Sequence, residues 1–181
     1  MISIQQCVLL VIDVQGKLAG LMHSQSYLRN VQAMIKASQI LNIPVLLTEQ
    51  APDKIGTTIP EIRGMLANQA PIIKQAFSCC GEAHFMDAFS RLGRTQVIVT
   101  GIESHVCVYQ TVRDFLRSGY EVHLVVDAVS SRAGLNSTIG IKRSEDEGAI
   151  ITTTEMIITE LIQSTKHPRF RDIMALLKSI T

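Results

Sequence analysis

The fold class that the sequence predicts is α/β, in three layers, with a parallel sheet covered by helices on both sides. Short runs rich in Val, Ile and Leu alternate with amphipathic stretches of helical spacing, and no repeat, linker or low-complexity tract interrupts them. Several runs lack polar alternation, which is typical of strands buried on both faces. With 181 residues, 46% of them hydrophobic and 18% charged, the chain fits one domain over residues 1–181.

Six runs are predicted to be strands, and helical stripes lie between them. The strands are expected at residues 7–14, 45–48, 71–74, 96–101, 122–127 and 149–152. One helix is expected over residues 28–41, where Asn42 and Pro44 end it, and another over residues 108–116, ended by Gly119.

Two further helices are expected near the C-terminus. Thr152 and Glu155 have the spacing of a capping box, which predicts a helix that begins there and runs to Ile162. Pro168 suits the first turn of a last helix, which carries apolar residues as far as Leu177.

An acid, a base and a thiol follow three of the predicted strands. Because ligands of such sheets bind beyond the carboxyl ends of the strands, Asp13, Lys74 and Cys107 are candidate site residues. Asp13 ends an apolar strand, where a shielded carboxylate needs a partner, although it could simply cap the following turn. Considered alone, Lys74 would be interpreted as a strand-end lysine that reaches solvent. It is a candidate site residue because it is expected to pair with Asp13.

Cys107 lies where the fourth strand should turn into a helix. Unpaired N–H groups and the helix dipole at that point favour a thiolate, the species that attacks carbon, although a small buried residue is the commoner fate of a free cysteine. Cys7 is better interpreted as core, and Cys79 and Cys80 as an adjacent pair of loop thiols. His105 is expected at the surface or rim rather than paired with Cys107.

Charge and motifs exclude several classes of function. Lys and Arg number 17 against 16 Asp and Glu, a net charge of +1, and no basic run appears, so nucleic acid is not an expected partner. The apolar run 7–12 is far shorter than the ~20 residues that cross a bilayer, and no signal peptide precedes it, which predicts a cytoplasmic protein without a membrane partner. No metal-ligand spacing and no nucleotide-binding motif occurs, so neither a metal nor another cofactor is expected.

Four blocks of sequence carry a family resemblance. Residues 9–15 (LLVIDVQ), 74–78 (KQAFS), 100–108 (TGIESHVCV) and 126–132 (VDAVSSR) resemble, in order and separation, the isochorismatase-like hydrolase superfamily. The resemblance spans nearly the whole chain. Within the superfamily, residues 47–50 (LTEQ), the Ser-Ser-Arg132 turn and the tail 167–170 (HPRF) are most similar to the isochorismatase-domain-containing proteins of the MAR1 type.

This resemblance implies both a topology and a mechanism. The sheet order would be 3-2-1-4-5-6, with Cys107 as nucleophile, Asp13 as general base and Lys74 as the cation that orients Asp13. A cis peptide bond between Ile102 and Glu103 would let the N–H groups of Glu103 and Cys107 converge as an oxyanion hole.

Departures from the family pattern narrow the expected reaction. The segment after the second strand contains no His, which disfavours the metal site and activity of nicotinamidases, while Cys107 distinguishes the chain from true isochorismatases. The sequence fits a cofactor-independent cysteine hydrolase of small amides, carbamoyl compounds or esters better than either of these enzymes. The resemblance also implies a homo-oligomer. Arg132 is expected to hold a substrate carboxylate or to form a structural salt bridge. The residues expected to contact the small-molecule substrate are Gln15, Glu49, Gln50, Phe77 and Arg132.

Two other interpretations of the function remain open. The domain could have lost turnover and serve as a binding or scaffold protein, although it keeps all three triad residues. It could also be a redox sensor built on Cys79 and Cys80 or on Cys107, if a resolving thiol lies within range.

Overall fold

The computed structural model describes residues 1–180 and has an all-parallel sheet at its centre. Its order is β3-β2-β1-β4-β5-β6, and Ile12 of β1 pairs with Thr48 of β2 and with Gly101 of β4. The strands are β1 (Cys7–Ile12), β2 (Val45–Gln50), β3 (Ile72–Lys74), β4 (Gln96–Ile102), β5 (Glu121–Ser130) and β6 (Ile150–Thr152). The predicted fold class, strand count and order are therefore confirmed. The predicted domain extends to Thr181, which lies outside the described residues.

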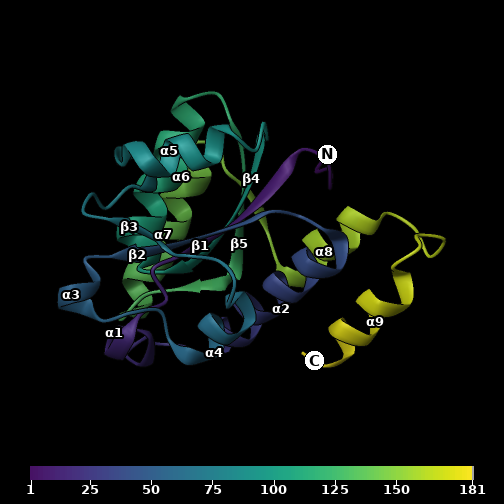
Figure 1. Cartoon of the computed structure of the whole chain (residues 1–181), viewed down its shortest axis with the longest axis horizontal. Coiled ribbons are helices and arrows are strands. Elements are labelled where there is room, and N and C mark those ends of the chain that lie inside the picture. The colour runs from purple at the N-terminus through teal and green to yellow at the C-terminus, as the bar shows by residue number, and fades with distance from the viewer. Residues whose placement is uncertain (181) are drawn as a thin grey trace.

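Helices cover both faces of the sheet, as Figure 1 shows. The helices are α1 (Gly16–Gly20), α2 (Ser26–Leu41), α3 (Pro52–Ile55), α4 (Pro60–Arg63), α5 (Ala83–Ser90), α6 (Tyr109–Arg117), α7 (Gly134–Asp146), α8 (Thr154–Ile162) and α9 (Phe170–Lys178). Single 3-10 turns occupy Gly64–Leu66 and Cys79–Gly81, and Ser104–Val108 forms a π-helical turn. The apolar stripes of α2, α8 and α9 pack in one core cluster, and those of α5 and α6 pack in another across the sheet.

Helix ends follow the capping residues of the sequence, with two corrections. Asn42 adopts the left-handed conformation (φ 56°) and ends α2, as expected. The residue that caps α8 is Thr153 rather than Thr152, because the Thr153 side chain accepts a hydrogen bond from the N–H of Met156. The last helix begins at Phe170, so Pro168 lies in the preceding turn rather than in its first helical turn.

The strands differ in length from the centre of the sheet to its edges. Every residue of β1 and β4 is buried, because these central strands have helices on both faces. The outermost strands, β3 and β6, have only three residues each. Short loops and the small helices α1 and α3 lie at the carboxyl ends of β1, β2, β3 and β4 (Figure 1).

Across residues 1–180, no helix combines the length and the hydropathy that crossing a membrane requires.

Candidate active site

The three candidate catalytic residues lie at the carboxyl ends of three strands. Asp13 directly follows β1, Lys74 ends β3, and Cys107 belongs to the π-helical turn between β4 and α6. Parallel strands β3, β2, β1 and β4 are neighbours in this order, so the fold brings together residues that are far apart in sequence.

Backbone strain accumulates at this same edge. Asp13, Ala51 and Glu103, which follow β1, β2 and β4, have φ values of 54°, 35° and 57°. The left-handed conformation is costly for residues other than glycine, on the order of 1–3 kcal/mol each. The other two such residues among those described, Asn42 and Gln163, end helices. Strain outside helix ends is therefore confined to the edge that carries Asp13 and Cys107.

The Asp13 carboxylate is buried and has two strong partners. Its Oδ2 lies 2.7 Å from Nζ of Lys74, and its Oδ1 accepts a hydrogen bond of 2.7 Å from the hydroxyl of Thr48. Asp13 is 3% exposed and Lys74 is 1% exposed. Because a buried charge is tolerated only with a partner, this ion pair explains how Lys74 stays inside the protein.

Lys74 is held by more than the aspartate. Its ammonium donates to Oε1 of Gln50 at 2.6 Å, to the carbonyl of Phe77 at 3.1 Å and to the carbonyl of Ala76 at 3.3 Å. Burial by itself lowers the pKa of Lys74, but the Asp13 carboxylate raises it, and the net shift is upward. Lys74 therefore remains a fixed cation beside Asp13 at neutral pH.

The surroundings of Cys107 raise the pKa of its thiol and so favour the protonated form. Burial is the largest cause that raises its pKa; the Asp13 carboxylate, which accepts a hydrogen bond from the thiol, raises it further, and Lys74 lowers it. The net pKa lies well above the ordinary range of a thiol. Desolvation and Asp13, which raise this pKa, thus outweigh Lys74, which lowers it. Asp13 is in position to take the proton.

The peptide bond between Ile102 and Glu103 is trans, so the predicted cis bond is wrong; all described peptide bonds are trans. The turn out of β4 is made instead by Glu103 in the left-handed conformation, with φ 57° and ψ 61°. The Glu103 carbonyl then accepts hydrogen bonds from the N–H groups of Val106 and Val108. The oxyanion hole formed by the N–H groups of Glu103 and Cys107 stays a prediction.

A pocket of about 470 Å³ opens over Cys107. Its lining combines residues that the sequence singled out with four that it did not. The former are Asp13, Gln15, Gln50, Phe77, Ile102, Glu103, Cys107 and Arg132, and the latter are Leu18, Leu21, Ile55 and Val106. The four missed residues are apolar: Leu18 and Ile55 lie in α1 and α3, Leu21 directly follows α1, and Val106 lies in the π-helical turn. These elements are too short to give a periodic sequence signal. In the sequence, these four residues could have been found only through their closeness to Asp13, Gln50 and Cys107.

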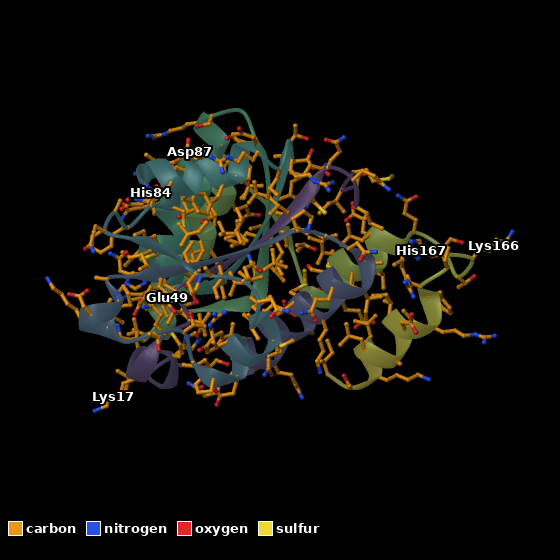
Figure 2. All side chains as sticks on the ribbon, in the orientation of Figure 1. Lys17, Glu49, His84, Asp87, Lys166 and His167 are labelled. Atoms are coloured by element: carbon orange, nitrogen blue, oxygen red, sulfur yellow. The ribbon has the colours of Figure 1, made fainter. Side chains whose placement is uncertain are left out.

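Glu49 does not line this pocket, contrary to the expectation. Its Oε1 accepts hydrogen bonds from the N–H and the hydroxyl of Thr58 at 2.7 and 2.6 Å. Side chains alternate along a strand, so Thr48 and Gln50 face Asp13 and Lys74 while Glu49 faces the other side. In Figure 2 the labelled Glu49 lies inside the fold, whereas Lys17 of α1 points outward at the same end of the molecule.

Gln15 lines the pocket, but its amide is bonded within the protein. Its Nε2 donates to the carbonyls of Gly56 (2.5 Å) and Gln50 (3.2 Å), and its Oε1 accepts from the N–H of Gln50 at 2.6 Å. Gln15 thus joins the loops after β1 and β2, which fixes the position of Gln50 beside Lys74.

Arg132 forms a salt bridge at the pocket rim. Its Nε lies 2.5 Å from Oε1 of Glu103, and Oε2 of Glu103 lies 3.2 Å from Nδ1 of His105. The same Nδ1 is 3.0 Å from the hydroxyl of Ser131. Of the two roles expected for Arg132, the structure contains the salt bridge. The His105 side chain is partly exposed, and its Nδ1 contacts Glu103 and Ser131.

The other three cysteines have different surroundings. Cys7 is fully buried in the core, as predicted, and burial raises its pKa to about 11. Cys79 is not a loop thiol: it is fully buried in a 3-10 turn, and its N–H donates to Oγ1 of Thr111. Cys80 is half-buried, and burial raises the pKa of both Cys79 and Cys80 to about 12. All four thiols are free.

Residues 1–180 contain no group of three or more His, Cys, Asp or Glu side chains arranged to hold a metal ion. The histidines and acids away from the pocket are scattered. Figure 2 shows His84 and Asp87 on α5, and His167 at the turn between α8 and α9, at the opposite end of the molecule from Lys17.

Comparison with known proteins gives consistent results for sequence and fold. The family model "Isochorismatase domain" matches residues 7–156. The isochorismatase domain-containing protein 2 of Danio rerio is 36% identical over 177 residues, which cover 97% of this chain and 89% of that protein. The structure of MAR1 ribonuclease from Caenorhabditis elegans has a TM-score of 0.91 and 37% sequence identity, covering 98% of this chain and 92% of the other.

A more distant structure shares the fold alone. The YcaC gene product of Escherichia coli, described as an octameric hydrolase of unknown specificity, has a TM-score of 0.86 and 21% identity, covering 99% of this chain and 97% of the other. The family match covers far more than half of the chain and includes the strand ends that carry Asp13, Lys74 and Cys107. The chain therefore belongs to the isochorismatase family of hydrolases.

Proposed function

We propose that this protein is a cofactor-independent cysteine hydrolase that cleaves a small amide, carbamoyl compound or ester through a thioester on Cys107. The observation that carries the proposal is the line of contacts from Lys74 through Asp13 to the Cys107 thiol, beneath a pocket of about 470 Å³. These are the three groups that acyl transfer needs: a nucleophile, a base within reach and a cation that holds the base.

In the first half of the reaction, Asp13 takes the thiol proton as the Cys107 sulfur bonds to the acyl carbon. The carbonyl electron pair moves to oxygen, which gives a tetrahedral oxyanion, and the N–H groups of Glu103 and Cys107 are the proposed donors to it. Collapse of this intermediate breaks the C–N or C–O bond. Asp13 returns the proton to the leaving amine, ammonia or alcohol, and a thioester remains.

In the second half, water replaces the leaving group. Asp13 accepts a proton from the water as its oxygen attacks the thioester carbon, and the second tetrahedral intermediate expels the sulfur. The proton on Asp13 passes to the Cys107 sulfur, and the carboxylic acid leaves. Lys74 stays protonated throughout and keeps Asp13 aimed at the sulfur; Thr48 does the same from the other oxygen.

The test is turnover of a panel of small amides, carbamoyl compounds and esters. Cys107→Ala should lower kcat/KM by at least about 10³-fold, because it removes the nucleophile. Cys80→Ala, a half-buried thiol outside the pocket, is the matched control and should retain wild-type turnover. Equal activity in wild type and Cys107→Ala on every hydrolysed compound contradicts the proposal.

The alternative is a catalytically inactive binding or scaffold protein. A stoichiometric protein partner in a pulldown, together with no thiol-dependent turnover of any panel member, would favour that alternative.

Because the C. elegans relative is named a ribonuclease, RNA belongs in the panel of test substrates. Arg132 is the one cation in the described pocket lining, and Glu103 neutralises it, which makes phosphate binding unfavourable.

We also propose that the protein is a cytoplasmic homo-oligomer. Four free thiols suit a reducing compartment, and Leu135 and Ile139, one turn apart on α7, are 74% and 50% exposed. The YcaC structure, an octamer, has the same fold. Light scattering after size exclusion should give a multiple of 19.9 kDa, and Leu135→Lys with Ile139→Lys should reduce it. A monomeric wild type contradicts the oligomer.

A further inference from the structure

The wall of the pocket over Cys107 is apolar. Six of the lining side chains are aliphatic or aromatic, and they come from four different segments: Leu18, Leu21, Ile55, Phe77, Ile102 and Val106. Leu21 and Phe77 are 62% and 54% exposed, so part of this apolar wall is accessible to a bound molecule. Such a wall gains free energy when it covers an apolar group and offers nothing to a hydrated one.

The polar groups of the lining are already bonded within the protein. The Gln15 amide bonds to the backbone of Gln50 and Gly56. The Gln50 side chain accepts from Lys74 and donates to the carbonyl of Gln75 at 2.8 Å. Both N–H groups of the Gln15 amide are therefore used inside the protein, whereas the Gln50 amide uses one of its two N–H groups there.

The charges around the pocket are paired as well. Asp13 is matched by Lys74 at 2.7 Å, and Arg132 is matched by Glu103 at 2.5 Å. Glu103 is nearly buried, whereas the Arg132 side chain is 59% exposed, so the carboxylate is the more deeply placed member of the rim pair. A carboxylate entering the pocket would face Glu103 and would give up its water without meeting an unpaired cation.

We propose that the pocket selects uncharged substrates with an apolar acyl group, and that Glu103, by pairing with Arg132, is the specificity-determining residue that keeps anionic substrates out. This inference rests on the proposed function, because it assigns the substrate class of the same site. It predicts hydrolysis of neutral aliphatic or aromatic amides and esters, and discrimination against the same compounds carrying a carboxylate.

The first test uses two alkylating probes that differ in charge, because it does not require turnover. Iodoacetamide is neutral and iodoacetate is its anionic counterpart, and both form a thioether with the sulfur and release iodide. The ratio of their rates at Cys107, measured by peptide mass mapping, should be at least tenfold higher in the folded protein than in the protein unfolded in urea. N-butyl iodoacetamide should gain on iodoacetamide upon folding. An unchanged ratio, or no labelling of folded Cys107 by either probe, overturns the inference.

The second test alters the charge at the rim. Glu103→Gln keeps the size of the side chain but frees Arg132 from its carboxylate, so the preference for the neutral probe should fall at least fivefold. Glu155→Gln, an exposed glutamate on α8, is the matched control and should leave the preference unchanged. An equal preference in wild type and Glu103→Gln removes Glu103 from the proposed role.

A third measurement separates this inference from the proposed function. For p-nitrophenyl butyrate and the p-nitrophenyl monoester of succinate, kcat/KM should favour the neutral ester by at least tenfold in the wild type. Hydrolysis that depends on Cys107 but favours the anionic ester overturns the inference and leaves the proposed function intact. Absence of Cys107-dependent hydrolysis across the whole panel overturns the proposed function, while the alkylation ratio still decides the charge preference of the pocket.

Discussion

At the scale of single residues, the site depends on the ion pair between Asp13 and Lys74. Both groups are almost completely removed from water. The attraction between the two charges offsets the free energy that each loses by desolvation. Lys74 also satisfies Gln50 and two backbone carbonyls, which makes it the centre of a polar network beneath an apolar pocket. Its role is therefore structural as well as chemical.

Lys74→Met should lower the free energy of unfolding by about 3–5 kcal/mol, because it leaves the Asp13 carboxylate buried without a cation. Urea unfolding followed by circular dichroism measures the change. Adding Asp13→Asn to Lys74→Met removes the stranded charge and should recover part of the loss. A double variant less stable than Lys74→Met would show that the pair is not the cause.

Gln50 offers a test between two roles. The structure uses it to hold Lys74, so Gln50→Leu should lower kcat about tenfold, equivalent to ~1.4 kcal/mol, with KM changed less than twofold. Steady-state kinetics on any hydrolysed panel member measures both constants. A raised KM with unchanged kcat would instead support the substrate contact that the sequence suggested.

At the scale of elements, the sequence predicted the strands and the strand-end residues more fully than the loops between them. Apolar runs identified all six strands, and the rule for parallel sheets placed Asp13, Lys74 and Cys107 at one edge. The alternation of side chains along a strand explains why Glu49 faces away from Asp13. Glu49 was predicted to be a site residue from its residue type and its position at a strand end.

The remainder of the site depends on interactions that a sequence pattern does not contain. The left-handed backbone at Asp13, Ala51 and Glu103 arises from tertiary contacts, since none of these residues is a glycine that would signal it. The raised pKa of Cys107 arises from burial and from the approach of Asp13, and these competing effects cannot be ranked without distances.

The backbones of β4 and β1 approach closely at Gly101, and one added methyl group can test this close approach. Gly101 has a φ of 125°, and an added Cβ would lie 2.2 Å from the carbonyl oxygen of Ile12, next to Asp13. Gly101→Ala should therefore abolish cooperative unfolding or lower stability by more than about 4 kcal/mol. Gly93→Ala, also at positive φ (60°) but with open space around it, should cost only about 1–2 kcal/mol. Similar losses in the two variants would contradict the close approach of β4 to β1.

At the scale of the whole molecule, the buried thiols link stability to alkaline pH. Burial raises the pKa of Cys7 to about 11 and those of Cys79 and Cys80 to about 12, and the pKa of Cys107 is raised as well. A thiol whose pKa is higher in the folded than in the unfolded state favours folding while it is protonated. This contribution is present below the unfolded pKa, near 8.5, and is lost as the pH rises toward the folded pKa.

The free energy of unfolding should therefore be steady below about pH 7 and fall as the pH rises further, most steeply between about pH 9 and 11, by up to about 5 kcal/mol per pH unit for four thiols. Urea titrations at several pH values under reducing conditions measure the slope. Cys80→Ala should reduce the slope by about a quarter, because one of the four protons is removed. Equal stability at pH 8 and pH 10 would contradict the burial of these thiols.

The short outer strands have a consequence for how the molecule behaves at high concentration. A sheet edge presents unpaired N–H and C=O groups that can recruit strands from other molecules, the first step of aggregation. Here β3 and β6 offer three residues each, too short a template for a stable intermolecular ladder, although Ile73 and Ile150 are exposed on them. The longer strands, rich in Val and Ile, lie between neighbours on both sides and become available for such pairing only on unfolding. Resistance to amyloid-like assembly in this protein is thus set by the stability of the fold rather than by the composition of its strands.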